Sequence, residues 1–296
     1  MDPYIRAYEY EKNVNPPLES IPIITKNIHD CEYGITHIDL SATYRVEYAS
    51  TSPNLLASFI KVQKGNIFTM DTSFMAASHF FYIMQGTSEI KIDETLLHVG
   101  EGDILISPFT SNSIYIKNNG SEDLLIYYIN DSPLLQYLGS QPYKKTFKIA
   151  IYSKEFILQS LKDLANPNNN RKGILLSNQD TEMLGVNTIT PVLWSLYNEL
   201  PPKTNQRPHK HNSVALDLCI TCEDPENIYS LIGEKIDEQG NIIDPIKVHW
   251  SKDGMFVTPP GLWHSHHNQG ETYAYILPIQ DAGLLLYQRI LGIVLL

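Results

Sequence analysis

Short apolar segments separated by polar turn residues dominate the chain. The first half contains ASFIKV, HFFYIM, EIKID, DILIS, SIYIK and LLIYYIN, with Gly, Asn, Asp and Ser between them. The second half continues the pattern with LWSLY, VALDLCI, NIYSLIG, FVTPP and YAYILPI. Strands this short and this evenly spaced, rich in β-branched and aromatic residues, are typical of a sandwich or barrel. The pattern therefore predicts an all-β protein.

One segment between the two groups of strands has the periodicity of a helix. It reads SKEFILQSLKDLANP and covers residues 153–167. Ser153 suits the N-cap, and Ile157, Leu161 and Leu164 form one apolar stripe. The Asn-Pro pair at its end stops a helix. We expect a helical linker here.

Three segments of the first half recur in the same order in the second half. The pairs are SPNLLASFIKVQKG with TPVLWSLYNELPPK, GDILISP with GMFVTPP, and SPLLQYLG with AGLLLYQRILG. Ordered repetition of this kind indicates a duplicated domain of roughly 100 residues. We expect an N-terminal arm over 1–44, a first barrel over 45–140, the linker over 141–180 and a second barrel over 181–296.

Composition and charge exclude several classes of protein. The 296 residues are 43% hydrophobic, which is enough for ordinary cores. Lys and Arg number 22 against 33 Asp and Glu, so the formal charge is −11, and no basic block occurs. Nucleic acid and anionic membrane surfaces are therefore not expected as partners. No run approaches the ~18 apolar residues of a membrane span, and the acidic N-terminal segment lacks a signal core.

The cysteines are sparse and odd in number: Cys31, Cys219 and Cys222. Without a secretion signal, this indicates a reducing, cytoplasmic location. Cys219 and Cys222 form a C-x-x-C pattern, but a spacing of three on a regular strand points the two thiols to opposite faces. We expect no zinc or redox role for them.

Two stretches concentrate the histidines: PHKHNSVALDL over 208–218 and TPPGLWHSHHN over 258–268. His209 and His211 are two residues apart, which on a strand places both on one face. His264 lies in a separate segment after a Pro-Pro-Gly turn. Three neutral imidazoles facing into a barrel suit a divalent transition metal. The alternative is a solvated loop, but the apolar, strand-like run after the pair favours the mouth of a barrel.

These two stretches resemble the paired motifs of the cupin superfamily. More narrowly, they are similar to the gentisate 1,2-dioxygenase group of bicupins, in which a His-x-His strand precedes a small and apolar run and the second motif reads T-P-x-x-x-W-H-x-H-x-N. The resemblance implies two cupin (double-stranded β-helix, jelly-roll) barrels joined by a short helical linker. It implies one iron(II) ion held by His209, His211 and His264, with a small molecule and O2 as substrates. We also expect a homo-oligomer, either a dimer or a tetramer.

The first barrel departs from this pattern. In SFMAASHFFYIMQG, His79 stands where the first motif carries a Glu, and Ser73 and Met75 stand near the missing histidine pair. Ser113 stands where the second motif has its His. We expect the first barrel to hold no metal and His79 to be a core histidine.

The second barrel departs in two positions that affect its chemistry. The common fourth ligand, a Glu, would fall near Ala215, so three coordination positions stay open for two substrate oxygens and O2. Ring-cleaving members have an Arg where this chain has Asp217, which strand alternation turns toward the pocket. An Asp repels a substrate carboxylate unless a cation such as Arg207 intervenes, so gentisate is expected to be a poor substrate. Asp217 is instead a candidate catalytic and substrate-binding residue, which can contact substrate, hydrogen-bond a ligand histidine or act as a distal ligand.

Further candidates surround this motif. His266 follows His264 by two residues and is a candidate catalytic acid or base, or else an exposed loop histidine. Trp194, Trp263 and Tyr275 are candidate walls of an aromatic substrate pocket, or else ordinary core residues.

Three functional classes fit these observations. The first is a non-haem iron(II) dioxygenase that oxidises or cleaves a small, aromatic, metal-chelated substrate. The second is a metal-dependent isomerase or lyase without O2 chemistry, and the third is a non-catalytic ligand-binding bicupin. Three histidines without an acidic ligand favour the oxidoreductase. Zn, Ni, Cu and Mn also accept imidazole ligands, so other divalent transition metals stay open.

Overall fold

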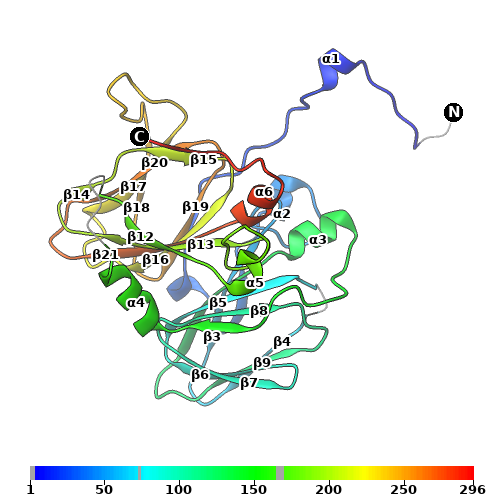
Figure 1. Ribbon diagram of the computed structural model, residues 1–296, viewed down its shortest axis with the longest axis vertical. Coiled ribbons are helices and arrows are strands. Elements are labelled where there is room, and N and C mark those ends of the chain that lie inside the picture. The colour runs from blue at the N-terminus through cyan, green and yellow to red at the C-terminus, as the bar shows by residue number, and fades with distance from the viewer. Residues whose placement is uncertain (1–3, 73–74, 165–169) are drawn as a thin grey trace.

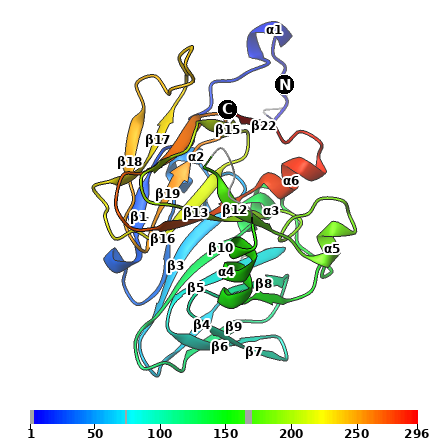
Figure 2. The same cartoon turned by 60° about the vertical axis from the view of Figure 1, so that its left-hand side comes forward.

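The computed structural model describes residues 4–72, 75–164 and 170–296. The chain forms two β-rich halves, one stacked on the other (Figure 1). The two halves also lie one above the other when the molecule is turned by 60° (Figure 2). No helix within the described ranges is long and apolar enough to span a membrane.

The first half is built from antiparallel strands in two sheets. Its strands are β2 (Gly34–His37), β3 (Leu56–Val62), β4 (Ile67–Met70), β5 (Ser78–Gln85), β6 (Thr87–Ile92), β7 (Thr95–Gly100), β8 (Ile104–Pro108), β9 (Ile114–Asn118), β10 (Leu124–Asn130) and β11 (Ala150–Tyr152). One sheet has the order β11-β8-β5-β10-β3-β2 and the other β4-β9-β6-β7.

The second half repeats this arrangement. Its strands are β1 (Thr25–Asn27), β12 (Lys172–Leu176), β13 (Trp194–Leu200), β14 (Thr204–Asn205), β15 (His209–His211), β16 (Ala215–Thr221), β17 (Ile228–Gly233), β18 (Ile246–His249), β19 (Gly254–Thr258), β20 (Trp263–Asn268), β21 (Ala274–Gln280) and β22 (Ile293–Leu295). The sheet orders are β1-β19-β16-β21-β13-β12 and β18-β17-β20-β15-β22, with β14 also paired to β20.

Helices are short and lie outside the sheets. They are α1 (Tyr10–Asn13), the 3-10 turn η1 (Ile28–Asp30), α2 (Ser41–Tyr44), α3 (Ser132–Leu138), α4 (Lys154–Lys162), α5 (Gln179–Glu182) and α6 (Ala282–Tyr287). The three recurring segments of the sequence fall on equivalent elements, namely β3 with β13, β8 with β19 and α3 with α6. The central strand order β8-β5-β10-β3 matches β19-β16-β21-β13. The repetition in the sequence is therefore a duplication of structure, and the prediction of an all-β fold with two similar halves is confirmed.

The largest core lies between the two halves. The outer faces of both six-stranded sheets pack there, with Phe59 and Tyr127 from the first half against Leu216, Val257 and Leu277 from the second. Each of these side chains is at most 1% exposed. Fully burying a side chain of this size stabilises the fold by roughly 1.5–3 kcal/mol. Two further apolar clusters fill the interiors of the two halves.

Helix α4 is the predicted linker helix, although it is shorter than expected. The backbone N–H of Phe156 donates to Ser153 Oγ at 3.2 Å, which makes Ser153 the N-cap. Ile157 and Leu161 are buried, whereas Leu164 lies beyond the helix and is 40% exposed. The Asn-Pro pair expected to stop the helix lies outside the described residues.

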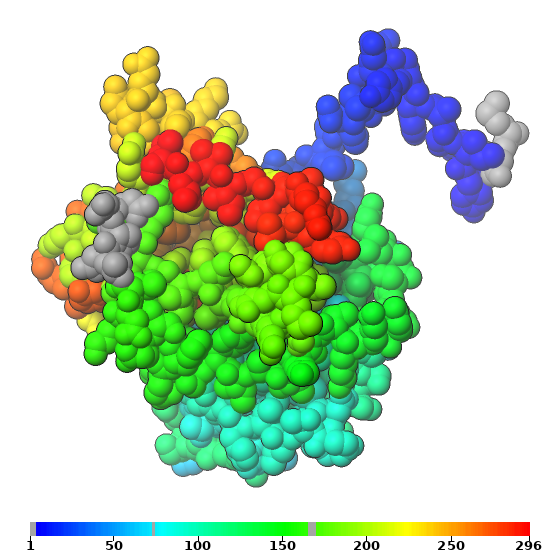
Figure 3. Space-filling model, in the orientation of Figure 1, coloured from blue at the N-terminus to red at the C-terminus, as the bar shows by residue number. Residues whose placement is uncertain are grey.

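The N-terminal segment contributes to both halves. Residues 4–20 are exposed, and the first part of this segment stands away from the body of the molecule (Figure 3). Strand β1 pairs with β19 of the second half, and β2 pairs with β3 of the first half. Part of the segment expected to be an arm is thus an edge strand of each six-stranded sheet.

A β-bulge corrects the expectation for the cysteine pair. The register between β16 and β21 shifts between Cys219 and Thr221. Because the extra residue resets the alternation of faces, Cys219 and Cys222 both lie in the interior cluster of the second half. The prediction that the two thiols face opposite sides is wrong.

Candidate metal centre

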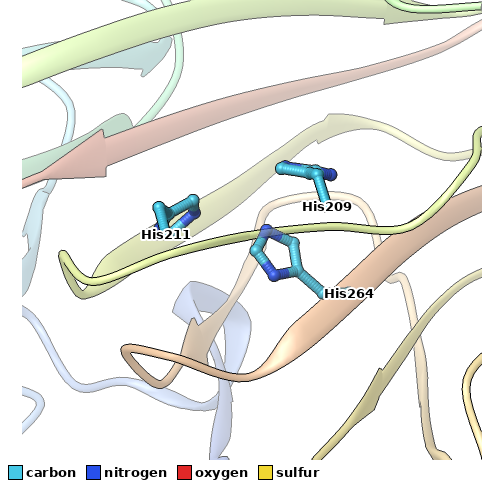
Figure 4. A group of neighbouring side chains, drawn as sticks. All are labelled: His209, His211 and His264. Atoms are coloured by element: carbon cyan, nitrogen blue, oxygen red, sulfur yellow. The ribbon is translucent and has the colours of Figure 1, made fainter. Parts of the chain in front are cut away.

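Three histidines converge on one point in the second half (Figure 4). His209 and His211 lie on β15, and His264 lies on β20 directly across from His209. Their potential ligand nitrogens all lie within 4.8 Å of one another. When three nitrogens bind a single ion at about 2.0–2.1 Å, they lie roughly 3–4 Å apart. Small side-chain adjustments would therefore bring these three nitrogens to the spacing that a metal ion requires.

The hydrogen bonds of two of these imidazoles suit metal binding. Nδ1 of His211 is 2.9 Å from the carbonyl oxygen of Ser213, and Nδ1 of His264 is 3.1 Å from that of Leu262. A carbonyl oxygen only accepts, so each Nδ1 carries the proton and Nε2 keeps its lone pair for a metal. Nδ1 of His209 is buried and has no hydrogen-bond partner within the described chain.

Burial keeps the triad neutral. It lowers the pKa of His211, and together with the neighbouring histidines it lowers the pKa of His209 and His264 well below the usual range. Neutral imidazoles are the form that binds a divalent cation. The donor set, the unpartnered nitrogen and the spacing all fit a divalent transition metal.

The triad opens onto a cavity of about 270 Å³. The residues that line it are Arg171, Gly173, Trp194, Leu196, Asn198, Gln206, His209, His211, Ala215, Asp217, His264, His266, Pro278, Gln280, Ile293 and Leu295. Apolar atoms make up most of the cavity surface, although nine of the sixteen lining residues, the three histidines among them, carry polar or charged side chains.

Asp217 lies in this cavity as an isolated acid. It is 2% exposed, and its Oδ2 accepts a hydrogen bond of 2.6 Å from the hydroxyl of Thr258. Burial raises its pKa to about 7, because that single hydrogen bond offsets little of the desolvation of the charged form. Asp217 is not part of the convergent group of possible metal ligands.

His266 presents a hydrogen-bond donor to the cavity. Its Nδ1 is 2.7 Å from Ser230 Oγ, which also accepts the indole N–H of Trp250 at 2.9 Å. Ser230 is fully buried, so His266 Nδ1 is the acceptor available to its hydroxyl proton. Burial lowers the pKa of His266 to about 3, so the ring is neutral and its proton lies on Nε2. Its ring centroid is 6.0 Å from that of His264.

The structure brings Trp194 into the cavity but not Trp263, Tyr275 or Arg207. Trp263 immediately precedes His264 on β20, so alternation turns it to the opposite face, where Lys210 Nζ lies 4.8 Å from its ring centroid.

Tyr275 lies on the face of β21 that points away from the cavity, whereas Pro278 and Gln280 of the same strand line the cavity. Its hydroxyl donates to Glu199 Oε2 at 3.1 Å. The carbonyl oxygen of Arg207 accepts from Arg171, and the Arg207 side chain does not line the cavity. These three substrate-binding assignments are therefore corrected.

Arg171 is a cavity residue that the sequence did not indicate. Its Nη2 donates to the carbonyl oxygens of Arg207 at 2.6 Å and Pro208 at 3.2 Å, and its Nη1 donates to that of Leu296 at 3.3 Å. The guanidinium thereby ties the start of β15 to β22, which pairs with it. Ile293 on β22 closes one wall of the cavity.

Asn198 is a second residue missed at the sequence level. It lies opposite Gly173 in the β12–β13 pair. A Cβ added at Gly173 would lie 1.8 Å from Asn198 Oδ1, so the asparagine side chain lies over the glycine. An isolated glycine in a strand is the available signal, because it often marks such a close approach.

The position in the first half that corresponds to His264 is occupied by an apolar residue. Asn118 and Asn268 make the same hydrogen bonds at the ends of β9 and β20. Counting back from them, the counterpart of His264 is Ile114, which is fully buried, and not Ser113. The assignment of Ser113 was off by one residue.

His79 occupies the interior of the first half as expected. It is fully buried, its Nδ1 lies 2.7 Å from the hydroxyl of Tyr128, and Phe81 stacks on Tyr128 at 4.7 Å. Met75 does not belong to the group of possible metal ligands, and Ser73 lies outside the described residues. Across the described ranges, the histidine triad is the one group found that suits a metal.

Comparisons with known proteins agree on the fold. No family model matches the chain, and no curated protein matches its sequence. Salicylate 1,2-dioxygenase from Pseudaminobacter salicylatoxidans matches with a TM-score of 0.71 and 12% identity, over 98% of this chain and 92% of that one. Its adduct with gentisate matches with a TM-score of 0.71 and 11% identity, over 96% and 87%. Procruciferin, an 11S globulin from Brassica napus, matches with a TM-score of 0.61 and 10% identity, over 94% and 87%.

The chain thus has the two-part β fold of these structures, and the described residues contain one candidate metal centre. A globulin shares the fold, so function has to be argued from the site.

Proposed function

We propose that this chain is a non-haem iron(II) oxidoreductase that oxidises or cleaves a small, aromatic, chelating substrate with O2. The observation that carries the proposal is the convergence of His209, His211 and His264 beside a ring-sized cavity. The resemblance to the cupin motif adds that Ala215 occupies the place of the usual fourth ligand. The chemistry that iron(II) supplies in such a site is chelation of substrate oxygens and activation of O2.

The residues of the chain have separable roles in this proposal. The three histidines hold the ion, and Trp194, Leu196 and Ile293 give the cavity apolar walls that exclude water. His266 donates its Nε2–H to an oxygen atom that gains negative charge, because Ser230 fixes the tautomer. Asp217 contacts the substrate at the far side of the cavity. A cytoplasmic location and a dimer or tetramer are parts of the same proposal.

One specific observation supports a second candidate. Asp217 stands where ring-cleaving relatives have an Arg, which fits a metal-dependent isomerase or lyase without O2 chemistry. In that case the ion would only polarise a carbonyl group.

Metal analysis and oxygen uptake separate these functions. Protein purified without oxygen is analysed for metal, reconstituted with iron(II) and tested for O2 uptake with hydroxybenzoates, catechols and aminophenols. The proposal expects one ion per chain in the wild type and in His79→Ala, none in His264→Ala, and uptake that depends on the substrate. Metal without uptake supports the second candidate, and absence of metal supports a non-catalytic bicupin. Two ions per chain would contradict the account of the first half.

A further inference from the structure

Asp217 is a buried acid that has no countercharge among the residues the structure describes. Within the described ranges none of the ion pairs includes it, and Thr258 is its hydrogen-bond partner. Buried carboxylates are normally paired, because desolvation of an isolated charge is costly. Its partner is therefore to be sought among ligands.

The position of Asp217 fixes where such a ligand would meet it. On β16 the inward-facing residues are Ala215, Asp217 and Cys219. Ala215 and Asp217 line the cavity, whereas Cys219 belongs to the apolar interior. Two residues along a strand span about 7 Å. Asp217 thus lies at the floor of the cavity, roughly one ring length below the level of Ala215.

The cation that lines the same cavity does not neutralise Asp217. Arg171 donates to the carbonyl oxygens of Arg207, Pro208 and Leu296, and it makes no ion pair with Asp217. The remaining polar lining groups, Asn198 and the other side-chain amides and imidazoles, are neutral.

A bound metal ion would not by itself supply the missing positive charge for Asp217. The neutral imidazoles leave a divalent ion with two positive charges, and two ionised oxygens of a chelating ring cancel them. Asp217 then remains as the uncompensated charge beside the ring. Burial already raises its pKa to about 7, which reflects how poorly the carboxylate is stabilised when alone.

We propose that the cavity selects a chelating ring compound that carries an amine, with the protonated amine paired to Asp217, and that it rejects ring carboxylates. The inference rests on the proposed function, since it assumes that the triad holds an ion, and it adds the chemical class of the substrate. Two like charges about 4 Å apart at an effective dielectric near 20 repel by an amount that corresponds to about a thousandfold in affinity. If the ring carboxylate lies farther than about 4 Å from Asp217, we expect the repulsion to lower its affinity by at least tenfold.

The affinities of ring compounds for the zinc-loaded full chain test this preference for an amine. No turnover takes place, because zinc is redox-inactive. The probes are three catechols that differ in one substituent: 3,4-dihydroxybenzylamine, 4-methylcatechol and 3,4-dihydroxybenzoate. Calorimetry is expected to rank them in that order, with at least tenfold between the first and the last. Asp217→Asn keeps an acceptor for Thr258 and is expected to bring the ratio close to one, whereas Asp217→Arg reverses the order. Asp131→Asn, a change at a buried acid outside the cavity, leaves the ratio unchanged.

The outcomes separate this inference from the proposed function. Equal binding of the amine and the carboxylate, or a ratio that Asp217→Asn leaves intact, overturns the inference while leaving the metal site in place. Equal binding of the amine and the methyl compound also overturns it, because the amine then makes no ion pair. A retained preference for the amine in a protein that never consumes O2 supports the inference and removes the oxygenase.

Discussion

The two equivalent asparagines allow the same perturbation to be made beside the metal centre and far from it. Asn118 ends β9, and its Nδ2 donates to the carbonyl oxygens of Val62 at 2.9 Å and Glu122 at 2.8 Å. Its Oδ1 accepts from the backbone N–H of Gly120 at 2.9 Å. The side chain is 1% exposed, so water cannot easily replace these bonds.

Asn268 repeats this arrangement on β20. Its Nδ2 donates to the carbonyl oxygens of Leu200 at 2.9 Å and Thr272 at 2.8 Å, and its Oδ1 accepts from Gly270 N–H at 3.0 Å. His264 lies four residues earlier on the same strand and the same face. Asn268 therefore fixes the C-terminal end of the strand that carries the metal ligand His264.

Asn→Ala at either position removes three hydrogen bonds, so that two carbonyl oxygens and one backbone N–H lose their side-chain partner. A buried group left unsatisfied costs about 1–3 kcal/mol, so we expect each variant to lose about 2–4 kcal/mol of unfolding free energy. Zinc affinity should respond differently. We expect Asn268→Ala to weaken it by about tenfold, because outer groups that position a ligand typically contribute this much, and Asn118→Ala to leave it unchanged.

Urea denaturation measures the first quantity, and competition with a coloured chelator measures the second. Equal losses of zinc affinity in the two variants would show that the effect is a general loss of stability. A loss of unfolding free energy below about 1 kcal/mol in both would refute the role assigned to the asparagines.

Three further changes test other parts of the structure. Gly173→Ala places a Cβ 1.8 Å from Asn198 Oδ1, so calorimetry should show weaker binding of 4-methylcatechol with zinc content unchanged; unaltered binding would remove Asn198 from the cavity wall. Burial raises the pKa of Asp131 from 3.8 to about 6, so the folded state holds the proton more tightly and the unfolding free energy falls as pH rises from about 4 to about 6. Asp131→Asn should remove up to about 3 kcal/mol of that fall in urea titrations at the two pH values, and an unchanged difference would contradict it. Arg171→Met should lower zinc affinity several-fold, since β15 loses its tie to β22, and a parallel titration of the wild type provides the reference.

The convergence of the histidines was predictable because it depends on local geometry. His209 and His211 share a face through their spacing alone, and the motif around His264 identifies the strand that meets them. The duplication was equally visible, since its repeats coincide with whole strands and with the starts of α3 and α6.

The remaining lining was not predictable because it depends on pairing between distant strands. Arg171, directly before β12, and Leu295, on β22, reach the cavity from strands that lie at the edges of their sheets. Two of the errors about which face a side chain occupies come from a shift of one residue, which turns a strand over. Ser113 was counted one residue away from Ile114, and the bulge after Cys219 was not visible in the sequence.

The placement of β1 has a consequence for the order of events on the ribosome. Thr25 pairs with Phe256, so about 230 residues are made between the two partners. At about 5–20 residues per second, synthesis of this length takes roughly 10–50 s. During that time β2 can join β3 as soon as the first half emerges, whereas β1 must wait as an unpaired edge strand. The nascent first half is therefore preceded by a segment whose partner strand is not yet made.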